Sequence, residues 1–156
     1  MISNGSATGD RVDSGQAPQR VGVLTGLAAS VLKMVVNKEL NMKFMILVKS
    51  NPDLEARLEA TSDSQMKDQM AAMEVFNKEL RKAGVMKDCD GLRLSREGKR
   101  VRFDGKSRTV VDGPFTGDLV AGYWLWELPS IEEAVAWVKR CPNPMSVSSD
   151  IEIRPI

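Results

Sequence analysis

The chain has 156 residues, of which 42% are hydrophobic, and its 22 basic and 21 acidic residues give a formal net charge of +1. The length predicts one ordinary domain, and the near-neutral charge disfavours nucleic-acid or anionic-membrane partners. There is no histidine, which excludes Ser-His-Asp and Cys-His catalysis and zinc sites that mix Cys with His. We therefore predict no metal site and no cofactor. Cys89 and Cys141 follow no secretory signal, so free thiols and a cytoplasmic location are expected.

The N-terminal part differs in composition from the rest. Residues 1–20 are rich in Gly, Ser, Asp and Arg and lack aromatic side chains, which predicts disorder. Residues 24–40 are compatible with a short amphipathic helix. We interpret residues 1–41 as a disordered or loosely helical extension, with Met42 as an alternative start of the native protein, and residues 42–156 as the folded domain. The sequence contains no run of about 18 apolar residues, so no membrane span is predicted.

The domain begins with a strand and two helical segments. The run KFMILV at residues 43–48 predicts a strand, and residues 54–60 predict a short helical turn. A longer amphipathic helix follows, capped by Ser62 or Asp63 and ended by Gly84. Its apolar stripe comprises Met66, Met70, Met73, Phe76, Asn77 and Leu80. Such a stripe is typical of a core-facing helix, and a methionine-rich stripe is also suited to an adaptable binding surface.

Three short alternating segments, at residues 91–95, 99–103 and 107–111, predict strands. REGK and DGKS separate them, and the Asp-Gly pair of the second sequence is a strong hairpin signal. In KRVRF, Val101 and Phe103 alternate with two arginines, which predicts one packed face and one wet, basic face. The basic face is either a solvated strand face or an anion-facing patch.

The last part of the chain reads as strand, helix and strand. The sequence DLVAGYWLWEL at residues 118–128 predicts a long strand. Ser130 with Glu133 predicts a capping box for a helix at residues 131–140, and DIEIRPI predicts a closing strand. The resulting order, β-α-β-β-(β)-β-α-β, indicates an α+β fold of ferredoxin-like layout, with an antiparallel sheet and two helices on one face.

Both faces of this sheet are predicted to be apolar. Along the long strand Val120, Trp124, Trp126 and Leu128 alternate with Leu119, Ala121, Tyr123 and Leu125. Two helices cover only one face, and each large aromatic side chain carries about 150–250 Å² of surface. Several of them left exposed would exceed the apolar patch usual for a monomer. We therefore predict a homodimer that packs sheet against sheet, with a candidate small-molecule cavity between the sheets.

Several motifs resemble the DGPF-domain, or YCII-related, proteins. They are the opening MKFMILVK, Asp-Gly-Pro-Phe at residues 112–115, the Gly-Tyr-Trp strand, the helix followed by Cys-Pro, and the closing IEIRPI. The resemblance covers residues 42–156 and implies a bacterial protein with a ferredoxin-like, dimeric α/β-barrel fold. It also implies genes often placed beside extracytoplasmic-function sigma factors. The His-Asp pair ascribed to some relatives has no counterpart here, because the chain has no histidine.

The Asp-Gly-Pro-Phe segment has two interpretations. As a turn, Asp112 bonds the nearby backbone and Phe115 anchors the loop in the core. As the lip of the inter-sheet cavity, it makes Asp112 a candidate general base, with Tyr123 as a candidate proton donor. The candidate ligand-binding residues are Arg154, Glu127, Trp124 and Phe115.

Two of these residues also have structural interpretations. Arg154 could clamp an anionic group or pair with Asp112, Glu127 or Glu152. Glu127 could instead be an edge charge that discourages aggregation. The function expected is that of a small cytoplasmic dimer that binds or transforms a small molecule. The alternative is a non-catalytic dimeric interaction module linked to sigma-factor-type regulation.

Overall fold

A computed structural model describes residues 28–32 and 41–156 of the chain. Residues 28–32 are helical, and the rest of the prediction for residues 1–40 falls outside the described part. No helix within the described ranges is long and apolar enough to cross a membrane.

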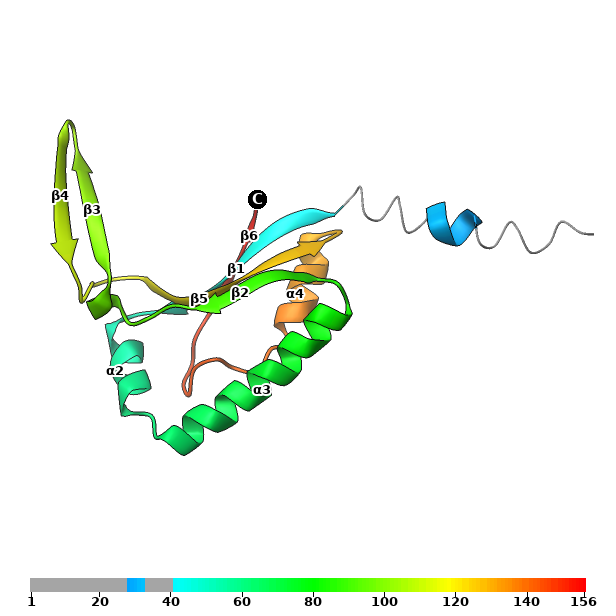
Figure 1. Cartoon of the computed structure of the whole chain (residues 1–156), viewed down its shortest axis with the longest axis horizontal. Coiled ribbons are helices and arrows are strands. Elements are labelled where there is room, and N and C mark those ends of the chain that lie inside the picture. The colour runs from blue at the N-terminus through cyan, green and yellow to red at the C-terminus, as the bar shows by residue number, and fades with distance from the viewer. Residues whose placement is uncertain (1–27, 33–40) are drawn as a thin grey trace, which may run out of the picture. The chain divides into compact units, whose positions relative to one another are not determined.

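Four antiparallel strands form the main sheet, in the order β2-β5-β1-β6 (Figure 1). They are β1 (Met42–Ser50), β2 (Met86–Gly91), β5 (Leu119–Leu128) and β6 (Ile151–Pro155). In this sheet β5 and β1 are the central strands, and β2 and β6 are the edge strands. This α+β arrangement is consistent with the predicted ferredoxin-like layout.

The helices begin at residues whose side chains accept backbone hydrogen bonds. They are α2 (Pro52–Ala60), α3 (Asp63–Lys82) and α4 (Ile131–Val138). Asn51 caps α2, with Pro52 in its first turn, so this helix starts earlier than predicted. Ser62 caps α3 in a complete capping box with Gln65. Ser130 Oγ accepts the Glu133 N–H, but the reciprocal bond of the predicted capping box is absent from α4.

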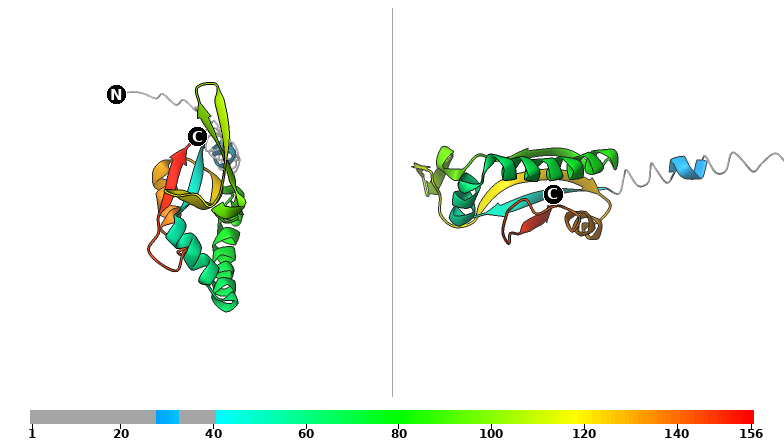
Figure 2. Two further views of the ribbon diagram at one scale, coloured as in Figure 1. Left: turned by 90° about the vertical axis from the view of Figure 1, so that its left-hand side faces the viewer. Right: turned by 90° about the horizontal axis from the view of Figure 1, so that it is seen from below.

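The core lies between the sheet and the helices, which cover one face (Figure 2). Phe44, Ile46 and Trp126 are fully buried from the sheet side, and Leu80 of α3 is fully buried from the helix side. The ring of Phe76 contacts three tryptophans, Trp124, Trp126 and Trp137, at centroid distances of 6.4–6.5 Å. The methionine stripe of α3 belongs only partly to the core. Met73 packs against the core, whereas Met70 is 65% exposed.

A bulge reverses the predicted faces at the start of β5. The register of β1 and β5 shifts so that Val48 pairs with Gly122, and Lys49 pairs with Val120. Ala121 is therefore the extra residue, and alternation restarts beyond it. As a result Leu119 is buried beside Ser50, and Val120 lies on the opposite face with Lys49. The predicted grouping of Val120 with the tryptophans is wrong for this reason.

The second strand also differs from the prediction. β2 comprises Met86–Gly91, not residues 91–95, and a 3₁₀ helix η1 (Ser95–Glu97) replaces the predicted REGK turn. The sequence MKDCDG contains no β-branched or aromatic residue. It is extended because its backbone pairs with β5 from Met86 to Gly91. Pairing thus overrides local propensity at this edge.

The DGKS hairpin is confirmed, but its packing is not as predicted. β3 (Lys99–Asp104) and β4 (Ser107–Asp112) form a separate two-stranded sheet, turned at Gly105 with φ of 53°. This hairpin, called the arm below, projects from the main sheet on the side opposite α3 (Figures 1 and 2). Every residue of β3 is exposed, so the described residues of one chain do not form the packed face predicted for KRVRF.

Candidate functional site

Asp112 closes the base of the arm. It is the last residue of β4 and lies opposite Lys99, the first residue of β3. Lys99 Nζ approaches Asp112 Oδ1 at 2.5 Å, and the Asp112 side chain is 73% exposed. The described residues of a single chain therefore do not enclose Asp112 in the way that its predicted role as a general base requires.

The residues after Asp112 lock the arm to η1 and α2. Gly113 N–H donates to Gly98 O at 3.1 Å, and the Gly113–Pro114 peptide is cis. Phe115 N–H donates to Ser95 Oγ at 3.2 Å. Ser95 in turn donates to both carboxylate oxygens of Glu55, from N at 2.8 Å and from Oγ at 2.6 Å. The Asp-Gly-Pro-Phe segment thus acts as a structural joint.

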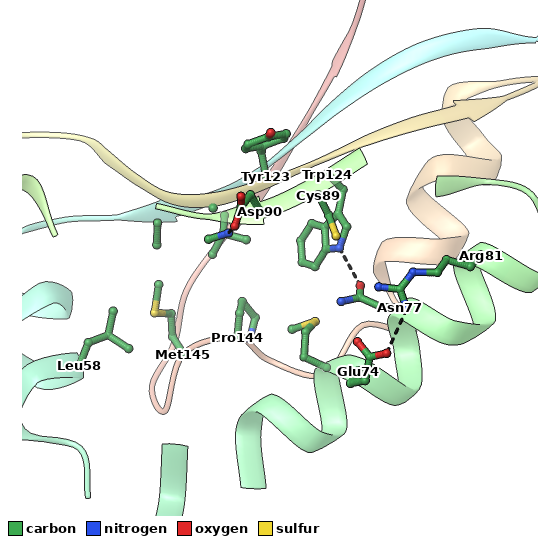
Figure 3. Close-up of a pocket in the computed structure, with 15 residues that line it drawn as sticks. Leu58, Glu74, Asn77, Arg81, Cys89, Asp90, Tyr123, Trp124, Pro144 and Met145 are labelled. Atoms are coloured by element: carbon green, nitrogen blue, oxygen red, sulfur yellow. Dashed lines mark hydrogen bonds and ion pairs between the residues drawn. The ribbon is translucent and has the colours of Figure 1, made fainter. Parts of the chain in front are cut away.

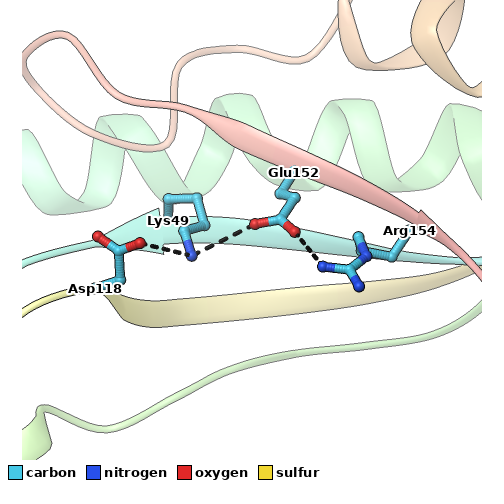
Figure 4. A network of polar contacts seen from close by, with 4 residues as sticks. All are labelled: Lys49, Asp118, Glu152 and Arg154. Atoms are coloured by element: carbon cyan, nitrogen blue, oxygen red, sulfur yellow. Dashed lines mark hydrogen bonds and ion pairs between the residues drawn. The ribbon is translucent and has the colours of Figure 1, made fainter.

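Within residues 41–156, the helices lie on one face of the main sheet only, and the other face is called the open face below. Its half-buried apolar residues are Met45, Leu47, Val120, Tyr123 and Leu125. A row of alternating charges crosses one side of it, from Asp118 through Lys49 and Glu152 to Arg154 (Figure 4). The Arg154–Glu152 contact is 2.9 Å, and the hydrogen bond from Arg154, with a further one from Lys49, lowers the pKa of Glu152. Among the pairings considered for Arg154, the one with Glu152 is formed.

Tyr123 and Glu127 lie on the open face beside the edge strand β2. Tyr123 Oη donates to Asp88 Oδ2 at 3.1 Å, and this bond to a carboxylate raises the pKa of Tyr123. Glu127 pairs with Lys87 at 3.4 Å. Because β5 lies between β2 and β1, Glu127 is on a central strand, and its interpretation as an edge charge is wrong.

A pocket of about 430 Å³ lies on the other side of the sheet, between β5 and the helices (Figure 3). Trp124, Met73, Leu58 and Met145 supply apolar walls. Figure 3 shows Trp124 directed toward α3, whereas Tyr123 stands on the opposite side of β5. Trp124 Nε1 donates to Asn77 Oδ1 at 2.8 Å. This bond fixes the Asn77 amide so that its NH₂ group remains available as a donor.

The ionisable groups around this pocket are not arranged for nucleophilic attack. Arg81 at its rim is paired with Glu74 at 3.0 Å. Burial raises the pKa of the Cys89 thiol, which keeps it protonated and unreactive near neutral pH. The residues that surround the pocket are therefore suited to holding a molecule.

Comparison with known proteins adds the decisive observation. The family model of the YCII-related domain matches residues 42–156, about three quarters of the 156-residue chain. The chain belongs to the YCII-related family. Curated proteins, by contrast, include no match to this chain.

The candidate site residues of this YCII-related domain are spread over three places. Asp112 and Phe115 are at the base of the arm, Tyr123, Glu127 and Arg154 are on the open face, and Trp124 is in the pocket beneath it. Tyr123 and Arg154 share a face but are separated by β1. No hydrogen bond or ion pair among the described residues joins Asp112 to either of them.

Sequence reasoning missed three residues that carry polar contacts in this YCII-related domain, namely Asn77, Ser95 and Glu55. Asn77 had a local signal, because it is the polar member of the apolar stripe of α3. The contact of Ser95 with Glu55 joins residues 40 positions apart. No local pattern marks such a pair.

Proposed function

We propose that this YCII-related protein is a homodimer that binds a small molecule in the pocket beneath β5. The observation that carries the proposal is the oriented amide of Asn77 in a pocket with apolar walls. Ligand sites are typically concave and mostly apolar, with a few directed polar groups, and span about 300–1,000 Å³. The pocket, at about 430 Å³, falls within that range.

The residues around the pocket favour a particular ligand chemistry. Met73, Trp124 and Met145 would contact apolar or aromatic carbon, and methionine adapts well to irregular shapes. The free NH₂ donors of Asn77 would bind a carbonyl or ether oxygen. The guanidinium of Arg81 is already neutralised by Glu74. We therefore favour a neutral, largely apolar molecule with one hydrogen-bond acceptor.

Binding is the better supported class of activity, because Asp112 and Tyr123 are held by other partners in a single chain. Asp112 is paired with Lys99, and Tyr123 donates to Asp88. Their predicted catalytic roles would need a second copy to enclose both the base of the arm and the open face. The two unpaired thiols, Cys89 and Cys141, support placement in a reducing bacterial cytoplasm.

The open face supports the homodimer. Its apolar residues, Met45, Leu47 and Leu125 among them, are only half-buried, and the helices of residues 41–156 lie on the other face of the sheet (Figure 2). Burial of apolar surface contributes roughly 25 cal/mol per Å², so pairing two such faces about a two-fold axis would stabilise a dimer. The arrangement would be a dimeric α/β barrel.

Ligand binding is tested by thermal shift with a panel of neutral apolar carbonyl compounds. A ligand at a hundredfold its Kd should add about 2.7 kcal/mol of stability. Asn77→Asp keeps an acceptor for Trp124 but removes the NH₂ donors, so it should abolish the shift. Gln69→Glu makes the same chemical change on α3 outside the pocket and should retain it. A panel without any hit would favour the interaction-module alternative.

The dimer is tested by sedimentation equilibrium. Wild-type protein should sediment at twice the chain mass, and Leu47→Lys on the open face should convert it to monomer. Val75→Lys is the matched control, because Val75 is an exposed apolar residue of α3. A wild-type monomer at micromolar concentration would refute the dimer.

A further inference from the structure

The arm presents apolar side chains to solvent. In the β3–β4 register Val101 faces Val110, and Phe103 faces Arg108, so these four residues share one face of the ribbon. Val101, Phe103 and Val110 are 51%, 69% and 61% exposed. A two-stranded hairpin is only marginally stable alone in water. Such a face indicates that a further surface covers it.

The arm is nevertheless firmly anchored at its base. Lys99 pairs with Asp112, and Gly113 N–H donates to Gly98 O. The ring of Phe115 packs under the guanidinium of Arg100, with 4.1 Å between the Arg100 Cζ and the ring centroid. The arm is therefore presented in a defined direction, which lowers the entropic cost of docking.

Charge favours a second copy of the chain as the covering surface. The arm, residues 99–112, has five basic and two acidic residues, whereas the rest of residues 42–156 has 13 basic and 16 acidic residues. The formal net charge is thus +3 for the arm and −3 for the rest of residues 42–156. Asp88 and Asp90 on β2 place part of this negative charge beside the open face. Complementary charge of this kind steers association and fixes register.

The direction of the arm agrees with this occupant. It rises from the main sheet on the side opposite α3, which is the side of the open face (Figures 1 and 2). A second copy stacked on the open face would lie alongside the arm. A nucleic acid would use the arginines and could stack a base on Phe103, but it would leave the aliphatic Val101 and Val110 without an apolar partner, whereas the apolar open face of a second copy supplies one.

We propose that the arm clasps a second copy of this chain, its Val101–Phe103–Val110 face packing on that copy. The inference rests on the proposed homodimer and adds a reciprocal exchange of arms to it. By two-fold symmetry each copy gives one arm and receives one. The sheet-to-sheet contact and the two arm contacts then contribute separately to the dimer.

Site-specific cross-linking tests the contact directly. Phe103→p-benzoylphenylalanine is incorporated into the full chain, and the purified protein is mixed with isotopically labelled chain before irradiation. The expected product is a covalent dimer of one labelled and one unlabelled chain, with the cross-link in peptides of the main sheet or the arm. Cross-links only within one chain, or none, would overturn the proposal. The same variant can also be irradiated in cells. Cross-links there to a different protein or to nucleic acid, without a covalent dimer, would also overturn the proposal.

Sedimentation of matched variants separates the arm from the sheet contact. Replacing the three apolar residues in Val101→Thr/Phe103→Thr/Val110→Thr retains strand propensity and should raise the dimer Kd on the order of 100-fold. Arg102→Thr, on the other face of the arm, should leave the dimer Kd within about threefold of the wild-type value. Far-ultraviolet circular dichroism checks that each variant is folded.

The outcomes distinguish the two proposals. If the triple variant dimerises as tightly as wild type while Leu47→Lys is monomeric, the arm inference fails and the sheet dimer stands. If the triple variant is monomeric and Leu47→Lys still dimerises, the arm stands and sheet pairing fails. A wild-type monomer overturns both.

Discussion

Both carboxylate oxygens of Glu55 accept hydrogen bonds from Ser95, one from its N–H at 2.8 Å and one from its hydroxyl at 2.6 Å. Glu55 is in the first turn of α2, and Ser95 begins η1. Ser95 Oγ also accepts the Phe115 N–H. A single side chain therefore connects α2, η1 and the segment that follows the arm.

Removing that hydroxyl should loosen the joint. Ser95→Ala takes a donor from Glu55 and an acceptor from Phe115, and Ser95 is buried. Loss of hydrogen bonds at such a site typically costs about 1–3 kcal/mol. Urea denaturation should show a loss of this size for Ser95→Ala. The exposed Ser148→Ala should change stability by less than about 0.5 kcal/mol, and equal effects would contradict the joint.

Gly113 is required because the backbone of η1 comes too close for a side chain. A Cβ at Gly113 would lie 1.8 Å from Ser95 O. Gly113→Ala should therefore destabilise the protein by more than about 2 kcal/mol or detach the arm. Limited proteolysis within residues 99–112 measures detachment. Gly91→Ala, where nothing lies within 4 Å of the added Cβ, is the matched control and should resist cleavage like wild type.

The titration of Tyr123 can be followed without interference, because it is the single tyrosine of the chain. The hydrogen bond to Asp88 raises its pKa, since the phenolate would lose the bond and face a negative charge. Asp88→Asn should move the phenolate absorbance titration to lower pH. An unchanged titration curve would show that another group holds the phenol.

Cys141 should make stability fall in alkaline solution. Burial raises its pKa from 9.0 to about 11, so the unfolded chain loses this proton first as pH increases. Its contribution to stability is complete below about pH 9 and is lost as pH rises through 11. Urea denaturation across this range should show a smaller loss for Cys141→Ala than for wild type. Parallel curves would argue against a buried thiol.

Much of the fold follows from local sequence. Ser62 and Ser130 mark the starts of α3 and α4, and the aromatic alternation marks β5, because caps and alternation act over a few residues. β2 and the bulge at Ala121 do not follow from local sequence. They arise from pairing with a strand that lies elsewhere in the chain, and a one-residue offset reverses every side chain beyond it.

The candidate site is less accessible to sequence reasoning than the fold. The Asp-Gly-Pro-Phe segment stands out as a motif, but its partners Ser95 and Glu55 lie about 20 and 60 positions earlier and carry no local signal. From the sequence, Asn77 can be recognised only as a polar residue in an apolar stripe. Its role depends on Trp124, 47 positions away.

The order of strands in the main sheet also governs how chains can stack at high concentration. Its outer strands are β2 and β6. β2 carries Lys87, Asp88 and Asp90, while β6 has five residues and ends at Pro155, which has no N–H to donate. Charge, brevity and proline are devices that block strand addition at an edge. Both edges of the main sheet are therefore protected against addition of a strand from another chain, which disfavours cross-β polymerisation through this sheet.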